Sequence, residues 1–191
     1  MRLMLLTMLT SACFLASCAE DDSATTEIDA GEPQSVEELT PAEVAPPPSA
    51  VPSLSPLWTA EGFQQPEGAA LDPEGNYFIS NVGGGATDEK DGDGYITVVY
   101  PEGDIAIERW AEGLNAPKGM VVQNGTLFVT DIDTVHRFDM YSGAAFDPIV
   151  VEGAEFLNDA TLWREQVYVS DSRTGRIHRI TEEGAEVWKE G

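Results

Sequence analysis

An acidic, glycine-rich stretch is the first segment whose residue types and spacing could bind a metal ion. Glu89-x-Asp91-x-Asp93-Gly-x-Ile follows the opening positions of a calcium-binding loop, with Glu89 in place of the usual first aspartate. Tyr100 stands where such a loop needs its bidentate glutamate, and no pair of helices is expected around it. The alternatives are a calcium site built on Glu89, Asp91 and Asp93, or an exposed acidic loop between two strands.

The sequence disfavours two other kinds of chemistry. His136 and His178 align with each other in the repeat described below, which suggests a scaffold role, and no motif places either beside a nucleophile. The glycine run at residues 83–85 lacks the following helix that a phosphate-binding loop needs. Nucleophilic hydrolysis and nucleotide binding are therefore not expected.

Three polar residues occupy equivalent positions in an internal repeat. Glu-Gly pairs at 61–62, 112–113, 152–153 and 190–191 begin successive units, and Glu67, Lys118 and Asn158 each lie five residues after the glycine of their unit. Units of about 40 to 50 residues with several strands each are typical of β-propeller blades. We expect all three side chains at the start of the innermost strand, facing the central channel.

A second equivalent set follows the second strand of each unit. It consists of Asn81, Asp131 and Asp171. These channel-facing candidates either line the mouth of the channel or accept hydrogen bonds from backbone N–H groups at the following turn, which is the commoner role of Asp and Asn at such positions.

Each unit is expected to form four strands. Runs of consecutive apolar β-formers imply strands that are buried on both faces, and Asn124-Gly125 is a strong hairpin signal because both residues tolerate positive φ. No segment has a helical apolar stripe. The expected strands lie near 69–71, 77–79, 96–98 and 105–110 in the first unit, 120–122, 127–129, 135–138 and 146–150 in the second, and 160–162, 167–169, 177–180 and 186–188 in the third.

The predicted fold class is all-β: a β-propeller of four-stranded blades at about 57–110, 111–150 and 151–191. Propellers usually close with four to eight blades. We therefore expect about three blades of six, either as a fragment of a longer chain or as a half that closes by self-association with a second copy.

The first 56 residues are expected to lie outside the fold. Residues 1–18 look like a signal peptide, and Leu15-Ala16-Ser17-Cys18 resembles the lipobox of bacterial lipoproteins, which implies lipidation of Cys18 and a membrane anchor. Residues 19–56 are acidic, rich in proline and without a base, which predicts a disordered tether. The expected location is the outer membrane facing the periplasm, or the cell surface.

The charge balance excludes one class of partner. The chain has 34 acidic and 10 basic residues, with a formal net charge of -24. Nucleic-acid binding needs clustered Lys and Arg, so nucleic acid is not expected as a partner. Cys13 and Cys18 are the two cysteines, so residues 57–191 contain neither a disulfide nor a thiolate zinc ligand.

Several segments resemble the gluconolactonase/regucalcin-like (senescence marker protein) family of six-bladed propellers. The resemblance covers Leu57 to Gly191, about half of such a domain, and NHL-repeat and strictosidine synthase-like propellers share the strand pattern. The segments that carry it are Gln65-Pro66-Glu67-Gly68, Leu114-Asn115-Ala116-Pro117-Lys118-Gly119, Phe156-Leu157-Asn158-Asp159 and Val169-Ser170-Asp171-Ser172.

This resemblance implies a divalent cation (calcium, magnesium, manganese or zinc) in the channel and hydrolysis of a sugar lactone or small ester by metal-activated water. Glu67 and Asn158 would be ligands, and the remaining ligand, an aspartate that also assists hydrolysis, would lie in blades outside this sequence. Lys118 departs from the pattern because its charge opposes cation binding. The alternative is a non-catalytic, NHL-like propeller that presents a surface for a small molecule or a protein.

Overall fold

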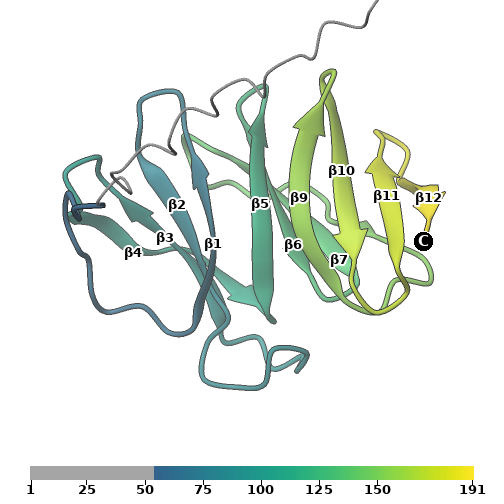
Figure 1. Cartoon of the computed structure of the whole chain (residues 1–191), viewed down its shortest axis with the longest axis horizontal. Coiled ribbons are helices and arrows are strands. Elements are labelled where there is room, and N and C mark those ends of the chain that lie inside the picture. Colours follow the sequence, from purple (N-terminus) through teal and green to yellow (C-terminus); the bar gives the residue numbers. More distant parts are fainter. Residues whose placement is uncertain (1–53) are drawn as a thin grey trace, which may run out of the picture. The chain divides into compact units, whose positions relative to one another are not determined.

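The described part of the chain consists of three antiparallel sheets (Figure 1). A computed structural model describes residues 54–191, and in that range it has strands and no helix. It follows that no described helix is long and apolar enough to span a membrane. Blade 1 contains β1 (Pro66–Leu71), β2 (Tyr77–Asn81), β3 (Gly94–Val99) and β4 (Ile105–Leu114); blade 2 contains β5 (Pro117–Gln123), β6 (Thr126–Asp131), β7 (Thr134–Asp139) and β8 (Ile149–Val150); blade 3 contains β9 (Leu157–Trp163), β10 (Gln166–Asp171), β11 (Arg176–Ile180) and β12 (Ala185–Glu190).

Each sheet has its four strands in the order of the chain, so every connection joins neighbours. This confirms the prediction of an all-β chain built from four-stranded blades. Eleven strands extend beyond their expected bounds, as β4 does past residue 110 to Leu114. Only β8 is shorter than expected, with two residues, Ile149 and Val150.

The first hairpin of blade 2 has the predicted turn. Asn124 and Gly125 have φ angles of 49° and 79°, as a two-residue turn between twisted strands requires. Blade 3 forms the same turn with Arg164 and Glu165, at φ 49° and 60°. Residues other than Gly and Asn rarely adopt this region, so positions 164–165 carry no hairpin signal in the sequence.

Two apolar layers hold the three blades together. The first joins blades 1 and 2 through Phe78, Ile96, Leu127 and Val129, and the second joins blades 2 and 3 through Val135, Leu157, Val167 and Val169. The innermost strands β1, β5 and β9 lie side by side (Figure 1). Burial on both sides of blade 2 explains the unbroken apolar runs of its strands.

Two glycines let the inner strands approach closely. A Cβ on Gly68 would lie 2.6 Å from the Lys118 carbonyl oxygen, and one on Gly119 would lie 2.5 Å from the Asp159 Cα. Hydroxyl groups bridge the same gaps, because Ser80 Oγ donates to the Lys118 carbonyl at 2.8 Å and Thr130 Oγ1 donates to the Asn158 carbonyl.

Candidate functional site

The starts of β1, β5 and β9 bring the first equivalent set to one end of the neighbouring inner strands, here called the channel end and defined by Glu67, Lys118 and Asn158. Each side chain is on the second residue of its strand. Glu67 is exposed, Asn158 is half-buried and Lys118 is 1% exposed. The repeat therefore predicted their shared location, and the structure adds how unequal their surroundings are.

Lys118 is a buried cation with a complete set of neighbours. Its Nζ donates to the carbonyl oxygens of Thr87 and Ala116, each at 2.8 Å, and lies 4.5 Å from the centroid of the Phe156 ring. Burial lowers the pKa of Lys118 below its ordinary value, while the negative charges of Asp131, Glu67 and Asp88 act in the opposite direction. Carbonyl oxygens and a ring face thus replace water around this ammonium group.

The two metal-ligand candidates have partly free oxygens. Asn158 Nδ2 donates to Ser172 Oγ at 3.1 Å, which leaves its amide oxygen available, and the Glu67 carboxylate is exposed. Both are hard donors of the kind that calcium or magnesium takes. Among residues 54–191, however, no group of three His, Cys, Asp or Glu side chains could hold an ion. The ammonium group of Lys118, close enough to Glu67 for their charges to interact, further opposes a cation here.

The second equivalent set accepts hydrogen bonds from the segment that enters the inner strand of the same blade. Asn81 Oδ1 accepts from Gln64 N–H at 3.0 Å, while the Asp131 carboxylate accepts from the N–H groups of Asn115 and Ala116, both at 2.8 Å.

Asp171 repeats this arrangement in blade 3. Its carboxylate accepts from the N–H groups of Glu155 and Phe156 at 2.9 and 3.0 Å, and from those of Arg173 and Thr174 in the following turn at 3.1 and 3.3 Å. Asn81, Asp131 and Asp171 are all at most 1% exposed. The structure thus places them inside the blades as backbone acceptors rather than at an open channel mouth.

Hydrogen bonding determines the ionisation of these two buried aspartates. For Asp131 burial acts to raise the pKa, but bonds from His136, Asn115 and Ala116 outweigh it and hold the pKa below its usual value. For Asp171 burial again acts upward, and the N–H groups of Glu155, Thr174 and Arg173 bring the net shift downward. Both side chains are therefore carboxylates at neutral pH.

The acidic loop between β2 and β3 uses its carboxylates to hold itself together. Asp93 accepts from the N–H of Gly84 at 2.8 Å, Glu89 from that of Ala86 at 3.3 Å, and Asp91 from that of Asp93 at 3.2 Å. These exposed side chains do not form a three-carboxylate cluster in the described region. Calcium binding by Glu89, Asp91 and Asp93 stays a prediction.

The two aligned histidines differ in their partners. His136 Nε2 lies 3.2 Å from Asp131 Oδ2 and its ring stacks near Phe138. His178 is buried with no partner for Nε2 among the described residues. Burial lowers the pKa of His178, opposed by Asp171 and assisted by Arg176. Neither histidine forms a contact with a hydroxyl nucleophile in the described region.

Two residues beside the channel end, Phe156 and Arg173, were not predicted as site residues. The guanidinium carbon of Arg173 lies 5.2 Å from the Phe156 ring centroid, and its Nη2 lies 3.0 Å from Asp88 Oδ2. Neither position carries a repeat signal, because Phe156 aligns with Ala116 of blade 2. Only the fold brings them beside Lys118.

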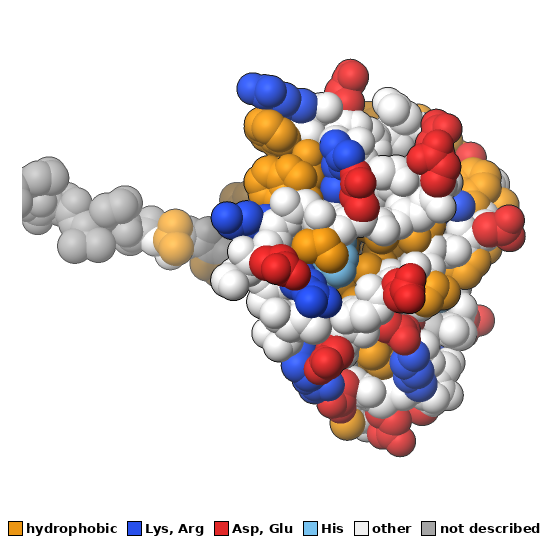
Figure 2. Space-filling view, turned by 90° about the vertical axis from the view of Figure 1, so that its right-hand side faces the viewer, with side chains coloured by type: hydrophobic (Ala, Val, Ile, Leu, Met, Phe, Trp, Pro, Cys, Tyr) orange, Lys and Arg blue, Asp and Glu red, His pale blue; other side chains and the backbone are white. Residues whose placement is uncertain are grey.

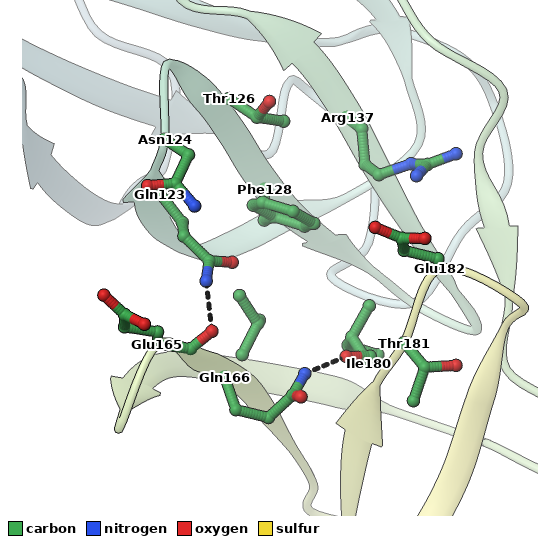
Figure 3. A pocket seen from close by; sticks show the side chains of 11 residues that line it. Gln123, Asn124, Thr126, Phe128, Arg137, Glu165, Gln166, Ile180, Thr181 and Glu182 are labelled. Atoms are coloured by element: carbon green, nitrogen blue, oxygen red, sulfur yellow. Dashed lines mark hydrogen bonds between the residues drawn. The ribbon is translucent and has the colours of Figure 1, made fainter.

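A cavity lies elsewhere, between blades 2 and 3 at the far end of β5 (Figure 3). It has a volume of about 480 Å³, and Figure 3 shows Phe128 at its wall, with Gln123 and Gln166 bonded to the backbone of Glu165 and Ile180. In blades 1 and 3 a tryptophan packs beside the equivalent ring, as Trp110 does on Phe78 at 4.9 Å. The strand register places Pro148 at this position in blade 2, and we attribute the cavity to that smaller side chain and to the short β8.

Comparisons with known proteins support the fold but no particular function. No protein-family model and no curated protein sequence matches the chain. A solved nidogen/laminin complex is similar with a TM-score of 0.53 at 17% identity, over 67% of this chain and 47% of that chain. Virginiamycin B lyase from Staphylococcus aureus gives 0.49 at 14%, over 65% and 41%, and a PQQ-bound aldose sugar dehydrogenase from Streptomyces coelicolor gives 0.46 at 15%, over 59% and 39%.

These neighbours are β-propeller proteins, and the chain spans less than half the length of each. At 17% identity the similarity to the nidogen/laminin complex, whose TM-score exceeds 0.5, shows the fold alone, which is consistent with a partial propeller. It supports the propeller part of the expected family resemblance and gives no support for the gluconolactonase-like family in particular.

Proposed function

We propose that this chain is a non-catalytic propeller segment whose channel end presents a binding surface. One observation carries the proposal: at the position equivalent to Glu67 and Asn158, blade 2 holds a buried Lys118 whose ammonium group is bonded to two carbonyl oxygens. A fixed cation beside the two candidate metal ligands opposes a divalent ion there. It suits a site that binds a ligand rather than one that hydrolyses a substrate.

The second candidate is the metal-dependent hydrolase of lactones or small esters. Its support is that Glu67 and Asn158 start the two strands that flank β5, with the oxygens of Glu67 exposed and the amide oxygen of Asn158 free. Among the described residues no three His, Cys, Asp or Glu side chains are grouped so as to hold an ion, so no catalytic step is assigned.

Thermal unfolding of the full chain with calcium, magnesium, manganese or zinc separates the two candidates. We expect no rise in Tm that depends on Glu67, and no turnover of a sugar lactone. The matched variants are Glu67→Gln at the channel end and Glu74→Gln in the exposed β1–β2 turn. A rise in Tm that Glu67→Gln alone removes, together with lactone hydrolysis, would overturn the binding role and establish the hydrolase.

We also propose that the chain is anchored in the cell envelope through Cys18. The support is the Leu15-Ala16-Ser17-Cys18 sequence after an apolar run, and this segment lies outside the described residues. Mass spectrometry of the mature protein should find acyl chains on an N-terminal Cys18. A Cys18→Ser variant should lose them, and an unmodified Cys18 in the wild type would contradict the proposal.

A further inference from the structure

The β2–β3 loop, residues 82–93, belongs to blade 1 but contacts both other blades near the channel end (Figure 1). The Thr87 carbonyl oxygen accepts from Lys118 Nζ at 2.8 Å, and Asp88 Oδ2 lies 3.0 Å from Arg173 Nη2. Lys90 Nζ lies 2.6 Å from Asp133 Oδ2. The loop therefore bridges cations of blades 2 and 3 with two of its consecutive residues.

Those two cations form a pair around one aromatic ring. Lys118 Nζ lies 4.5 Å and the Arg173 guanidinium carbon 5.2 Å from the Phe156 centroid. The chain carries 34 acidic and only 10 basic residues, so two cations at one aromatic ring are a departure from its overall charge. Such a pair is a suitable partner for the oxygens of an anion.

Thr87 and Asp88 supply such oxygens from within the chain. A carbonyl oxygen contacts the buried ammonium and a carboxylate contacts the guanidinium, so oxygens of this loop satisfy both cations. Lys118 is 1% exposed, so it needs replacement acceptors whenever the loop withdraws.

Two of the loop's contacts with the other blades are ion pairs between partly exposed side chains. The side chains of Asp88 and Arg173 are 46% and 50% exposed, and those of Lys90 and Asp133 are 53% and 33% exposed. Exposed ion pairs contribute little to stability. Three consecutive glycines at 83–85, with Gly83 at φ 102°, allow the loop to change its path.

From these contacts we propose that Lys118, Arg173 and Phe156 form a binding site for a small monocarboxylate, which Thr87 and Asp88 of the same chain occupy as an intramolecular competitor. The nearby negative charge of Glu67 favours a singly charged ligand over a phosphate. This inference rests on the proposed binding role and names the ligand class of the same surface.

The test uses the full chain, sodium acetate as the anion and acetamide as its neutral isostere, with binding followed by NMR chemical-shift changes. Asp88→Ala with Lys90→Ala should free the site and lower the Kd for acetate by about tenfold relative to wild type, because the competing segment no longer occupies it. Acetamide should not bind. Adding Arg173→Met, at a side chain that is half exposed, should abolish the gain.

The matched control is Glu102→Ala with Lys189→Ala, which also removes one exposed acid and one exposed base and so has the same net charge as the loosened variant. Its Kd for acetate should equal that of wild type. Equal acetate affinity in the loosened variant and wild type, or a gain that survives Arg173→Met, would overturn the inference. Either result would leave the metal and lactone experiment unaffected, so a failure here is distinguishable from a failure of the proposed function.

Discussion

Asp131 shows how one buried carboxylate can hold a blade together. It accepts two backbone N–H groups at 2.8 Å and contacts His136 at 3.2 Å, with no exposed surface. In Asp131→Asn the amide NH₂ must face one of these donors. We expect a loss of about 1–3 kcal/mol in the free energy of unfolding, measured by urea titration at pH 7.

The pH dependence of this loss has a definite sign. The pKa of Asp131 is lower in the folded chain than in the unfolded chain, so its charge stabilises the fold above the unfolded pKa of about 3.9. That stabilisation disappears as the pH falls below this value. The difference in the free energy of unfolding between wild type and Asp131→Asn should therefore narrow in acid. The exposed Asp104→Asn is the control and should match wild type at pH 7. A difference between wild type and Asp131→Asn that stays constant down to pH 3 would show that charge is not its source.

At the residue level, the sequence predicted where a side chain lies in the fold better than which groups it bonds to. The repeat aligned Glu67, Lys118 and Asn158 correctly at one end of the inner strands. It could not predict that Lys118 bonds to Thr87, because the β2–β3 loop has no counterpart in the other blades. Contacts between a repeat and an insertion depend on the path of the loop, which local spacing does not determine.

At the level of elements, two hairpin turns with the same backbone carry different residues. Asn124 and Gly125 suit positive φ, whereas Arg164 and Glu165 adopt it at a cost. Replacing Arg164→Asn and Glu165→Gly should raise the free energy of unfolding by about 1–2 kcal/mol, measured by urea titration. The reverse exchange, Asn124→Arg with Gly125→Glu, should lower it by a similar amount. Loss of stability in the first variant would show that Arg164, which lies over the Trp163 ring, contributes more than the strain costs.

The close approach of β5 and β9 depends on a glycine with no room for a side chain. A methyl group on Gly119 would lie 2.5 Å from backbone of blade 3. Gly119→Ala should therefore reduce stability by about 1–3 kcal/mol in thermal unfolding, because backbone on both sides must shift. Gly84→Ala is the control, since its nearest atom would be 3.5 Å away, and it should leave Tm unchanged. Equal effects of both substitutions would contradict the role of this contact.

Strand existence followed from apolar runs, but strand length did not. The runs predicted all the inner and middle strands, whereas β8 shrinks to Ile149–Val150 and leaves the cavity beside Phe128. Outer strands are partly exposed, and their extent depends on neighbouring packing more than on β-propensity.

Among the described blades, the face of blade 3 that points away from blade 2 is uncovered (Figure 2). Hydrophobic side chains lie there among acidic and basic ones, and a small apolar hollow of about 160 Å³ is lined by Trp163, Tyr168, Ile177 and Trp188. Trp163 and Trp188 are 50% and 51% exposed. In blade 1 the equivalent Phe78–Trp110 pair is covered by Phe138 of blade 2, so blade 3 carries the same kind of surface without its cover.

We expect a second copy of the chain to cover this face at high concentration, which sedimentation velocity measures. Trp188→Ser should weaken self-association on the order of tenfold, while Tyr100→Ser, half exposed on blade 1, should not. Asp159 occupies the position of Gly68 and Gly119, where a Cβ obstructs the next inner strand. Asp159→Gly should therefore strengthen association. A blade of a second copy on this face must contact the Trp188 indole and lie against the inner strand at Asp159. If neither Trp188→Ser nor Asp159→Gly changes the affinity of self-association, copies do not meet through this face.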